Sequence, residues 1–419
     1  MTSCKYLIVG CSHAGMSAAE AIRVRDDKGS ITMLTREDLM PYSPTILPYV
    51  ISGRTRPLAV FLKDEDEMAR LKIDFRQAAT VSGVNPSDRT VTLASGDRLA
   101  YEKLLLATGS LPATPPFPGI ESIPYHTLRT VDDALRLKDA MAGTTSAIVL
   151  GAGLIAIHAA ENLATAGVKV TVIVRSRLLR GYFDDQAGDI IRQILAAKGI
   201  TVIGDALINR IEDNAGKCMV VLDGKPPVTA DLLVAATGIS PCIGYLDGSG
   251  IRTENGVVVD ETMRASVKDV WAAGDVAQAR GFFDEKTQID ATLPSAMEQG
   301  RMAGMDMVDD KYLKHYIGGL SLNTYNFFGH RAFSIGFSSA TEGISDADTD
   351  VHCRPADNQF QKFIFQDNRL VGASAINTRL DPGVMYQLVR RRVDLTPDMS
   401  NFLADPVSTG RLLMSEIWR

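Results

Sequence analysis

The sequence predicts an α/β protein in which short apolar strands alternate with helices and assemble into parallel sheets. Two glycine-rich turns and two Ala-Thr-Gly turns each follow a short apolar segment, and a further apolar segment, 270–273, ends at Gly274 and Asp275. The four turns begin at Gly10, Ala107, Gly151 and Ala236. Parallel sheets bind their ligands at the carboxyl ends of their strands, where all five features are expected to lie.

Length and charge limit the class of protein. A chain of 419 residues is long enough for two or three domains. The net charge of −6 argues against a nucleic-acid surface, which needs a basic stripe. No apolar run approaches the roughly 18 residues of a membrane span, and the first strand begins too early to leave room for a signal peptide. We therefore expect a cytoplasmic protein.

The cysteines do not form a recognisable ligand set. The five are scattered, with no Cys-x-x-Cys pair, at Cys4, Cys11, Cys218, Cys242 and Cys353. Neither a disulfide framework nor a zinc or iron–sulfur site can be derived from this spacing. We therefore expect no metal site in the chain.

The first part of the chain is predicted to form one βαβ unit, followed by a small antiparallel segment. Strands are expected over 5–10 and 31–34, with an amphipathic helix over 14–25 between them. Residues 90–107 form a small antiparallel excursion that ends in a strand. The segment 111–120 contains four prolines in ten residues, so it is expected to be a linker and a domain boundary.

The pattern then begins again, as in an internal duplication. The expected elements are a strand over 147–150, a helix over 153–166, a strand over 169–174 and a helix over 185–198, with a last strand before Ala236. The strand 270–273 belongs to the first unit. The second unit is therefore expected to be inserted into the first.

Beyond about residue 311 the pattern changes to alternating strands followed by helices. Strands are expected over 331–338, 360–366 and 369–376, and helices over 384–392 and 409–418. The predicted organisation is two Rossmann-like dinucleotide-binding domains and a C-terminal α+β domain. Their boundaries are 1–112 with 243–312 for the first, 113–242 for the second and 313–419 for the third.

The first glycine turn is typical of a phosphate site. In Gly10, Ser12 and Gly15, the first glycine permits the tight turn and the last lets the helix pack against the strand. The middle position faces the pyrophosphate, and serine replaces the usual glycine there. The helix N-terminus still offers free amides to a phosphate. An acid for the ribose is not in its usual place, so Thr35 or Glu37 is the candidate.

The second glycine turn has Gly151 and Gly153, with Ala156 as an allowed third residue. The strand that follows ends in Arg175 and Arg177 instead of an acid. Guanidinium groups there suit a 2′-phosphate and favour NADP(H), although both arginines can equally form a solvated rim. The residues leave the choice of nucleotide open.

Taken together, these motifs resemble the pyridine nucleotide–disulfide oxidoreductase superfamily, the flavoproteins with two dinucleotide-binding folds. The resemblance covers nearly the whole chain and rests on the segments VGCSHAG, YEKLLLATGS, IVLGAGLIA, LLVAATGIS and GVVVDETMRASVKDVWAAGDVA. It implies FAD on the first domain, NAD(P)H on the inserted one and an interface role for the third.

The resemblance also implies the residues of each site. Asp275 would bind the ribityl chain, and a helix starting near Pro294 would direct its N-terminal dipole at the reduced ring. The residues implied for FAD are Gly10, Ser12, His13, Gly15, Thr35, Glu37, Pro44, Thr45, Ala107, Thr108, Gly109, Gly274, Asp275, Pro294, Ser295 and Ala296. Those for NAD(P) are Gly151, Gly153, Ala156, His158, Arg175, Arg177, Thr237 and Gly238.

The chain departs from the family in two places. The family's redox cysteine corresponds to Thr45, and a hydroxyl cannot carry thiol–disulfide or sulfenic-acid chemistry. His13, which the family places beside that cysteine, is then expected to pack or hydrogen-bond beside the flavin. His13 and Thr45 are the candidate catalytic residues. His158 replaces a common glutamate near the nicotinamide, which puts its contribution to binding in doubt.

A flavin without a second internal redox group must pass its electrons to another molecule. The sequence therefore predicts an FAD enzyme that exchanges hydride with NAD(P)H and single electrons with iron–sulfur subunits or a small iron–sulfur carrier. Residues 41–53 and 368–388 resemble flavin subunits of multisubunit complexes such as phenylglyoxylate dehydrogenase and tungsten-containing aldehyde oxidoreductase, which favours NAD. The alternatives are a stand-alone NAD(P)H:ferredoxin or rubredoxin reductase and a non-enzymatic flavin-binding module for assembly or sensing.

Overall fold

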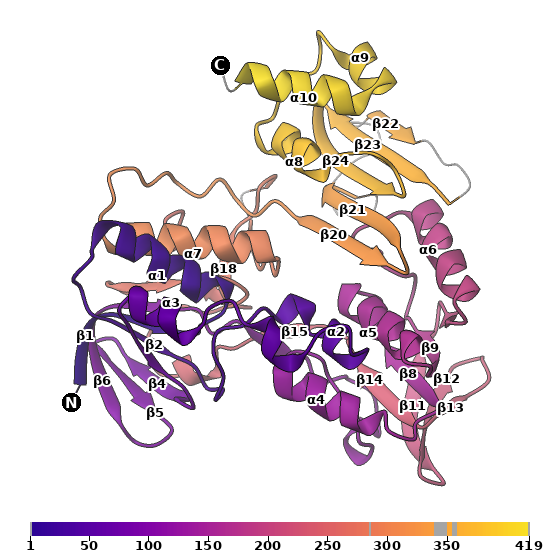
Figure 1. The fold of residues 1–419 in the computed structure, drawn as a ribbon, viewed down its shortest axis with the longest axis horizontal. Helices are drawn as coiled ribbons and strands as arrows, with labels where there is room; N and C mark the ends of the chain where they lie inside the picture. Colours follow the sequence, from indigo (N-terminus) through magenta and orange to yellow (C-terminus); the bar gives the residue numbers. More distant parts are fainter. Residues whose placement is uncertain (1, 285, 339–349, 354–357, 418–419) are drawn as a thin grey trace. The chain divides into compact units, whose positions relative to one another are not determined.

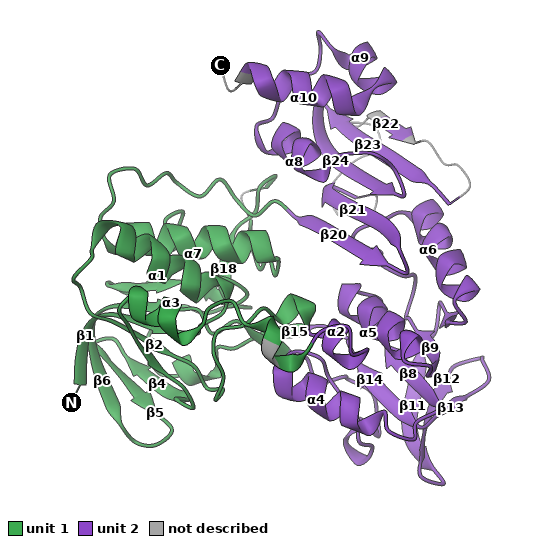
Figure 2. Cartoon of the chain, in the orientation of Figure 1, with its two compact units in different colours: residues 1–46, 56–111, 239–320 green, residues 47–55, 112–238, 321–419 purple. Residues whose placement is uncertain are grey.

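The computed structural model describes residues 2–284, 286–338, 350–353 and 358–417. The chain divides into two compact units, each made of three separate segments (Figure 2). Unit 1 comprises Met1–Ile46, Arg56–Leu111 and Ile239–Leu320, and unit 2 comprises Leu47–Thr55, Pro112–Gly238 and Ser321–Arg419.

Unit 1 is built on a seven-stranded sheet in the order β3-β2-β1-β6-β5-β4, with β17 also paired to β6 (Figure 1). The strands are β1 Thr2–Val9, β2 Ile31–Leu34, β3 Ile73–Arg76, β4 Val81–Asn85, β5 Thr90–Leu93, β6 Arg98–Leu106 and β17 Val270–Ala272. Strands β3, β2, β1, β6 and β17 run parallel to their neighbours, whereas β4 and β5 form an antiparallel excursion. The parallel part thus joins the first strands of the chain to a strand that follows the whole inserted segment.

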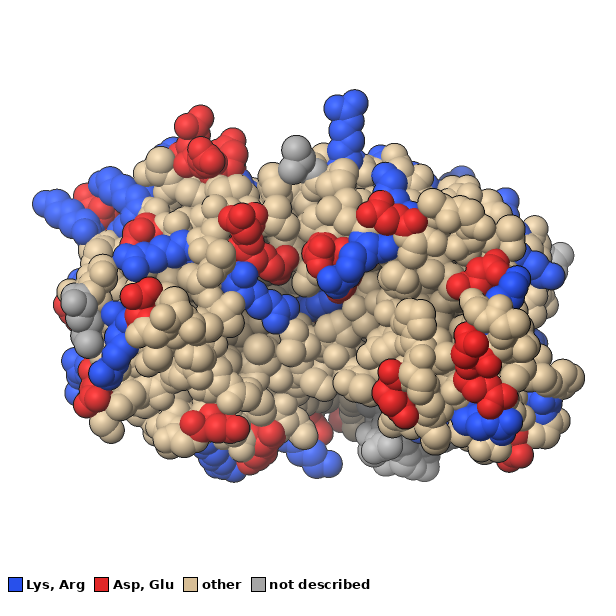
Figure 3. All heavy atoms as spheres, turned by 90° about the horizontal axis from the view of Figure 1, so that it is seen from below, with Lys and Arg blue, Asp and Glu red and all other residues tan. Residues whose placement is uncertain are grey.

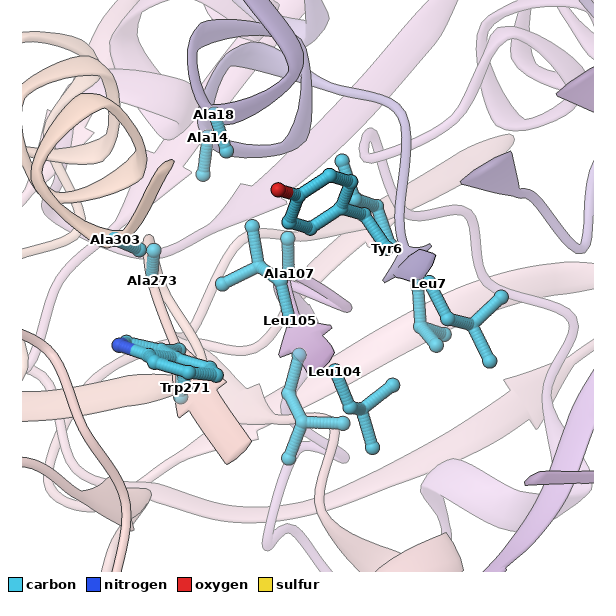
Figure 4. Close-up of a cluster of buried hydrophobic side chains, with 14 of the residues drawn as sticks. Tyr6, Leu7, Ala14, Ala18, Leu104, Leu105, Ala107, Trp271, Ala273 and Ala303 are labelled. Carbon is cyan, nitrogen blue, oxygen red and sulfur yellow. The ribbon is translucent and has the colours of Figure 1, made fainter. Parts of the chain in front are cut away.

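Strands β2 and β17 and the last residues of β1 and β6 are mostly apolar and are buried, which is typical of a parallel sheet that is covered on both faces. Leu7, Leu104 and Leu105 are fully buried, and Figure 4 shows them with Trp271 in the same apolar cluster. Burial of each such side chain contributes about 1.5–3 kcal/mol. The indole N–H of Trp271 donates to Asp306 over 2.8 Å, so this large side chain leaves no buried donor unpaired.

Two helices of unit 1, α1 (His13–Arg25) and α7 (Leu293–Met307), pack against each other and lie side by side in Figure 1. A Cβ atom on Gly300 would lie 2.1 Å from the carbonyl oxygen of Ala14, and one on Gly304 would lie 2.5 Å from that of Ala18. The two helices can approach this closely only because these positions lack a side chain.

The remaining elements of unit 1 are short. They are η1 Pro44–Ile46, η2 Pro57–Val60, α3 Glu65–Arg70, β7 Ser110–Pro112, β15 Ile239–Pro241, η4 Gly244–Leu246, β16 Val257–Val258, β18 Ala277–Arg280 and β19 Thr287–Gln288.

Unit 2 contains a second parallel sheet in the order β10-β9-β8-β14 and an antiparallel sheet in the order β11-β12-β13. The strands are β8 Ser146–Leu150, β9 Lys169–Ile173, β10 Thr201–Ile203, β11 Ile208–Asn214, β12 Lys217–Leu222, β13 Val228–Ala230 and β14 Leu232–Ala235. The helices are α2 Pro48–Ile51, η3 Ile120–Ser122, α4 Val131–Ala140, α5 Leu154–Thr165 and α6 Asp185–Ala197.

The last part of unit 2 is an antiparallel sheet in the order β20-β21-β24-β23-β22, followed by three helices. The elements are β20 Leu322–Phe327, β21 His330–Gly336, β22 Asp350–Cys353, β23 Phe360–Gln366, β24 Arg369–Ile376, α8 Pro382–Arg390, α9 Met399–Ala404 and α10 Pro406–Ile417. The α+β class expected for this region is confirmed.

The expected α/β class with parallel sheets is also confirmed, and most expected elements agree within a few residues. In the proline-rich segment 111–120, residues 113–119 have neither helix nor strand, as expected of a linker, whereas β7 reaches Pro112 and η3 begins at Ile120. The sequence also gave no indication of α9. Among the described residues, none of the helices combines the length and the apolar character that a membrane crossing requires.

On the face drawn in Figure 3, lysine and arginine side chains and aspartate and glutamate side chains are scattered among other residues that make up most of that face. In the described ranges, no group of three or more His, Cys, Asp or Glu side chains converges as a metal ion would require.

Candidate functional site

The first glycine turn joins β1 to α1 at the carboxyl edge of the unit 1 sheet. Gly10 has a φ of +113°, and a Cβ atom there would lie 2.0 Å from the carbonyl oxygen of Ala107. A Cβ atom on Gly15 would lie 2.0 Å from the carbonyl oxygen of Gly10. Both positions therefore need glycine, one for the turn and one for the close approach of helix and strand.

Ser12 is the N-cap of α1, but its side chain accepts no hydrogen bond from the helix. The first-turn amides of α1 are thus left for another acceptor, and the helix dipole favours an anion at this end. This end of the helix fits the pyrophosphate that the sequence predicts there.

A second wall of this site comes from the end of β17. The Gly274 N–H donates to Gln299 Oε1 over 2.9 Å, and the Ser110 hydroxyl donates to Asp275 Oδ2 over 2.8 Å. Because β17 pairs in parallel with β6, Asp275 and the turn that follows β6 meet at the same edge of the sheet. The structure thus brings together the carboxylate and the first two turns that the sequence predicts.

The Ala-Thr-Gly turn after β6 is fixed by contacts within unit 1. Thr108 Oγ1 donates to the Cys242 carbonyl over 3.1 Å and lies 3.2 Å from the Tyr245 hydroxyl. The Cys242 N–H donates to the Gly109 carbonyl over 2.9 Å. The Thr108 side chain therefore supports the turn, which itself lies at the edge of the candidate site.

Three polar side chains form a chain of hydrogen bonds next to the first turn. His13 Nε2 lies 3.0 Å from Ser43 Oγ, and Ser43 Oγ lies 2.8 Å from Thr45 Oγ1. Pro44 and Thr45 belong to η1, and Thr45 is exposed. Burial lowers the pKa of His13 below its usual value. His13 and Thr45, the two catalytic candidates from the sequence, are thus linked through Ser43. The sequence did not single out Ser43 as a candidate.

Thr35 and Glu37 follow β2 at the same edge. Thr35 is buried, and Glu37 Oε2 accepts a hydrogen bond of 2.7 Å from the Tyr42 hydroxyl. The neighbouring Cys11 is partly buried, and the loss of solvent around its thiol raises the pKa of that thiol to about 11. Cys11 is therefore protonated at neutral pH and is a poor nucleophile.

Helix α7 begins beside a buried carboxyl group. Thr292 caps the helix by accepting from the Ser295 N–H, and Pro294 lies in the first turn, one residue before Ser295. The Ser295 hydroxyl donates to Asp290 Oδ2 over 2.5 Å, and burial raises the pKa of Asp290. Ala296 is half-buried in the same turn. A helix start close to the predicted one is confirmed, and Asp290 adds a carboxyl group that the sequence did not reveal.

The second glycine turn lies at the carboxyl edge of the unit 2 parallel sheet. Gly151 has a φ of +136°, and a Cβ atom there would lie 2.2 Å from the Ala236 carbonyl oxygen and 3.4 Å from the Ala156 methyl group. Around a Cβ atom built on Gly153, by contrast, no described atom lies within 4 Å. The backbone at Gly153 thus faces open space, which leaves it accessible to a ligand.

The end of β14 forms the neighbouring wall of this second site. Thr237 Oγ1 is buried without a hydrogen-bond partner, and Gly238 has a φ of +138°. A buried hydroxyl that lacks a partner costs about 1–3 kcal/mol unless a ligand or water supplies one. The open glycine and the unpaired hydroxyl both fit a bound dinucleotide.

The arginines after β9 differ in their surroundings. Arg177 Nη1 donates to the Phe183 carbonyl over 2.6 Å, and Arg177 Nε lies 3.0 Å from Asp185 Oδ1. Arg175, in contrast, is exposed at the end of the strand. Arg177 therefore stabilises the start of α6, and Arg175 is the better placed of the two to meet a nucleotide.

His158 lies on α5 in a buried polar cluster of unit 2. Its Nδ1 lies 3.8 Å from Glu161 Oε2, and neither atom has a hydrogen-bond partner. The Tyr49 ring packs edge-on against the imidazole at a centroid distance of 6.4 Å. Burial lowers the pKa of His158. At neutral pH His158 is thus uncharged, unlike the glutamate that is common at this position.

Several residues of these sites could not be found from the sequence. They are Ser43, Ser110, Glu161 and Asp290, each of which is identified only by a contact with a segment distant along the chain or across a turn. No spacing motif marks them.

Comparison with known proteins gives a consistent result. The model of the pyridine nucleotide-disulphide oxidoreductase family matches residues 4–300. The NADH-dependent phenylglyoxylate dehydrogenase subunit epsilon of Aromatoleum evansii is 45% identical over 417 residues, which cover 99% of this chain and 98% of that protein. The rubredoxin–NAD(+) reductase of Pseudomonas putida is 30% identical over 66% of this chain and 73% of its own length.

Among solved structures, the covalent complex of putidaredoxin reductase with putidaredoxin contains a similar chain. The TM-score is 0.87 at 20% sequence identity, and the match covers 99% of both chains. This likeness shows that the fold with two dinucleotide-binding domains extends over the whole chain.

Proposed function

Because this chain belongs to the pyridine nucleotide-disulphide oxidoreductase family, we propose that it is the flavin-containing electron-transfer subunit of a larger dehydrogenase complex. It is an FAD-dependent NAD(P)H oxidoreductase. In the proposed role it exchanges hydride with NAD(H) and single electrons with iron–sulfur subunits. The relative of 45% identity is named as a subunit of an NADH-dependent dehydrogenase, which supports both the complex and the nucleotide.

One observation carries the proposal. The position of the family's redox cysteine holds Thr45, and its hydroxyl is joined through Ser43 to His13. A hydroxyl cannot be oxidised and reduced as a thiol can. The nearby Cys11 is kept protonated by burial, which raises the pKa of its thiol to about 11. Electrons that arrive at the flavin must therefore leave for another molecule.

The flavin itself supplies the conversion of a hydride into single electrons. The chain's part is to bind and orient it. In the proposed site the first turn of α1 holds the pyrophosphate, Asp275 accepts from the ribityl hydroxyls, and the N-terminus of α7 stabilises negative charge on the ring. The turn at Gly151 and Gly153, with Thr237, holds the nicotinamide nucleotide.

Copurification from the native host is the test of the proposed role. The chain should purify with partner subunits that contain iron and acid-labile sulfide, in a fixed ratio. A flavoprotein that purifies without such subunits and reduces ferredoxin or rubredoxin would replace the proposal with the stand-alone reductase. The rubredoxin–NAD(+) reductase relative is the observation that favours this second candidate.

Anaerobic titration with NADH distinguishes the two enzymes, the complex subunit and the stand-alone reductase, from a non-enzymatic flavin-binding module. Addition of NADH should bleach the visible absorbance of the bound flavin within the mixing time of the experiment. If neither NADH nor NADPH bleached it, the chain would be a flavin-binding module without reductase activity.

A further inference from the structure

His13, Ser43 and Thr45 form a continuous hydrogen-bonded chain, to which the family motifs assign no role once the redox cysteine is absent. The two distances, 3.0 Å and 2.8 Å, are those of ordinary hydrogen bonds, and in each bond the donor can be on either side. Ser43 is buried, Thr45 is exposed and His13 is half-buried. The chain therefore leads from an exposed hydroxyl through a buried one to an imidazole.

These three residues lie at the carboxyl edge of the unit 1 sheet. His13 is the first residue of α1, directly after the turn at Gly10. Asp275 and Ser110 lie at the same edge, which is where parallel sheets bind their ligands. The hydrogen-bonded chain is thus part of the ligand-binding edge.

The backbone holds the two hydroxyls in place without using their side chains. The Ser43 N–H donates to the Val60 carbonyl over 3.1 Å, and the Leu62 N–H donates to the Pro41 carbonyl over 2.6 Å. The Tyr42 hydroxyl anchors the segment to Glu37 over 2.7 Å. The hydroxyls of Ser43 and Thr45 are therefore available to each other and to His13.

The three groups have the chemistry of a proton relay. A serine or threonine hydroxyl donates one hydrogen bond and accepts others, so it can take up a proton on one side while it releases its own on the other. The His13 imidazole, whose pKa is lowered by burial, is neutral at pH 7 and can accept a proton. Both transfers use hydrogen bonds that are already present, so no heavy atom has to move for a proton to pass from His13 to Thr45.

We propose that Thr45, Ser43 and His13 carry away the proton that remains when the flavin is oxidised by one-electron acceptors. This inference rests on the proposed function. NADH delivers a hydride, which brings two electrons and one proton to the flavin, and two iron–sulfur centres each accept one electron. The balance is NADH + 2 oxidised acceptors → NAD⁺ + 2 reduced acceptors + H⁺. The released proton passes to the His13 imidazole, then through Ser43 to the exposed Thr45 hydroxyl and to solvent.

The two half-reactions respond differently to such a relay. Reduction by NADH needs no proton transfer by the protein, whereas oxidation by single-electron acceptors needs one. Stopped-flow measurements on the FAD-loaded protein, with ferricyanide as the acceptor that takes an electron and no proton, give both rates. In Ser43→Ala and Thr45→Val, the ratio of the oxidation rate to the reduction rate should fall about tenfold or more.

Matched variants separate the relay from a structural role. Thr45→Ser keeps a hydroxyl and should restore the ratio, and Ser82→Ala, an exposed serine of β4, should leave both rates unchanged. A ratio that stays the same in Ser43→Ala and Thr45→Val would overturn the inference, and so would an equal loss of both rates. Absence of any reduction by NADH or NADPH in the unaltered protein would instead reject the proposed function.

A measurement on the cofactor-free protein tests the hydrogen-bonded chain itself. In protein labelled with ¹⁵N-histidine, Ser43→Ala should shift the resonance of His13 Nε2, which is assigned by its loss in His13→Gln. An unmoved resonance would show that Ser43 does not contact the imidazole, and the relay would be rejected.

Discussion

Asp275 is the carboxylate on which the proposed FAD site depends most directly. It follows the end of β17 and accepts from Ser110 over 2.8 Å. Asp275→Ala removes a charged acceptor, and a hydrogen bond to a charged group contributes about 1.5–3 kcal/mol. We expect FAD affinity to fall roughly ten- to hundredfold, measured by fluorescence titration of the cofactor-free protein.

Asp275→Asn is the matched variant, because it keeps an acceptor oxygen and loses only the charge. Its affinity for FAD should lie between those of Asp275→Ala and the unaltered protein. Full retention of FAD by Asp275→Ala after gel filtration would remove this residue from the site.

Arg175 is the residue that tests the choice of nucleotide. It is exposed at the end of β9, whereas Arg177 contacts Asp185 and Phe183. If Arg175 contacts a 2′-phosphate, Arg175→Glu should lower kcat/KM for NADPH about tenfold or more relative to that for NADH, because it replaces attraction by repulsion.

The control is Arg192→Glu, which reverses the charge of another exposed arginine of unit 2, on α6. This variant should leave the ratio of the two kcat/KM values unchanged. If Arg175→Glu had the same ratio of kcat/KM for NADPH to kcat/KM for NADH as the unaltered protein, Arg175 would belong to the solvated surface and not to the nucleotide site.

At the scale of secondary-structure elements, α1 and α7, whose N-termini belong to the proposed FAD site, pack closely against each other. A methyl group at Gly300 would lie 2.1 Å from the Ala14 carbonyl oxygen, so the helices would have to separate. We expect Gly300→Ala to lower the free energy of unfolding by about 1–3 kcal/mol. Urea denaturation followed by circular dichroism measures this change.

Gly188→Ala is the matched control for that substitution. Gly188 also lies inside a helix, α6, but the nearest described atom to its added methyl group would be 3.8 Å away. Because alanine is the better helix former, this variant should be neutral or more stable by about 0.5–1 kcal/mol. If both variants changed stability alike, close packing would not be the reason for glycine at 300.

The elements that the sequence predicted well are those with a strong apolar pattern. Strands β2, β23 and β24 were predicted residue for residue, because β2 is a short, mostly apolar run and β23 and β24 show the alternating pattern of strands. Strand β20 was missed because polar residues interrupt its pattern. Helix α9 has only six residues, too few to show a helical period.

The residues of the candidate sites also fall into those that could be predicted from the sequence and those that could not. The glycine turns and Asp275 could be predicted, because their spacing along the chain reflects a backbone geometry that only certain residues allow. The family resemblance placed His13 beside position 45, but the hydrogen-bonded link through Ser43 could not be predicted, since it joins segments that are 30 residues apart. Such contacts are decided by packing and have no signature in the sequence.

At the scale of the whole chain, Glu161 connects distant parts of unit 2. Its carboxylate is buried, accepts from the Phe328 N–H over 2.9 Å and lies 3.4 Å from Arg54 Nη1. Phe328 is in the turn between β20 and β21. Glu161→Ala leaves this N–H without its acceptor, which costs about 1–3 kcal/mol. We expect faster amide hydrogen exchange in residues 322–336, measured by mass spectrometry.

An exposed glutamate of the same unit is the control. Glu212 on β11 pairs with Arg210 at the surface, and Glu212→Ala should leave the exchange of residues 322–336 unchanged. If Glu161→Ala also left it unchanged, the carboxylate would not be what holds this hairpin.

The order of segments along the chain has a consequence for biosynthesis. Strand β17 pairs with β6, yet the ribosome reaches residue 270 only after all of the inserted segment Pro112–Gly238 has been made. Translation adds about 5–20 residues each second, so the β6 edge stays uncovered on the nascent polypeptide for many seconds. Uncovered apolar edges promote aggregation. Chaperones that shield emerging chains should therefore raise the yield of this protein more than that of a protein whose sheet is completed in one stretch.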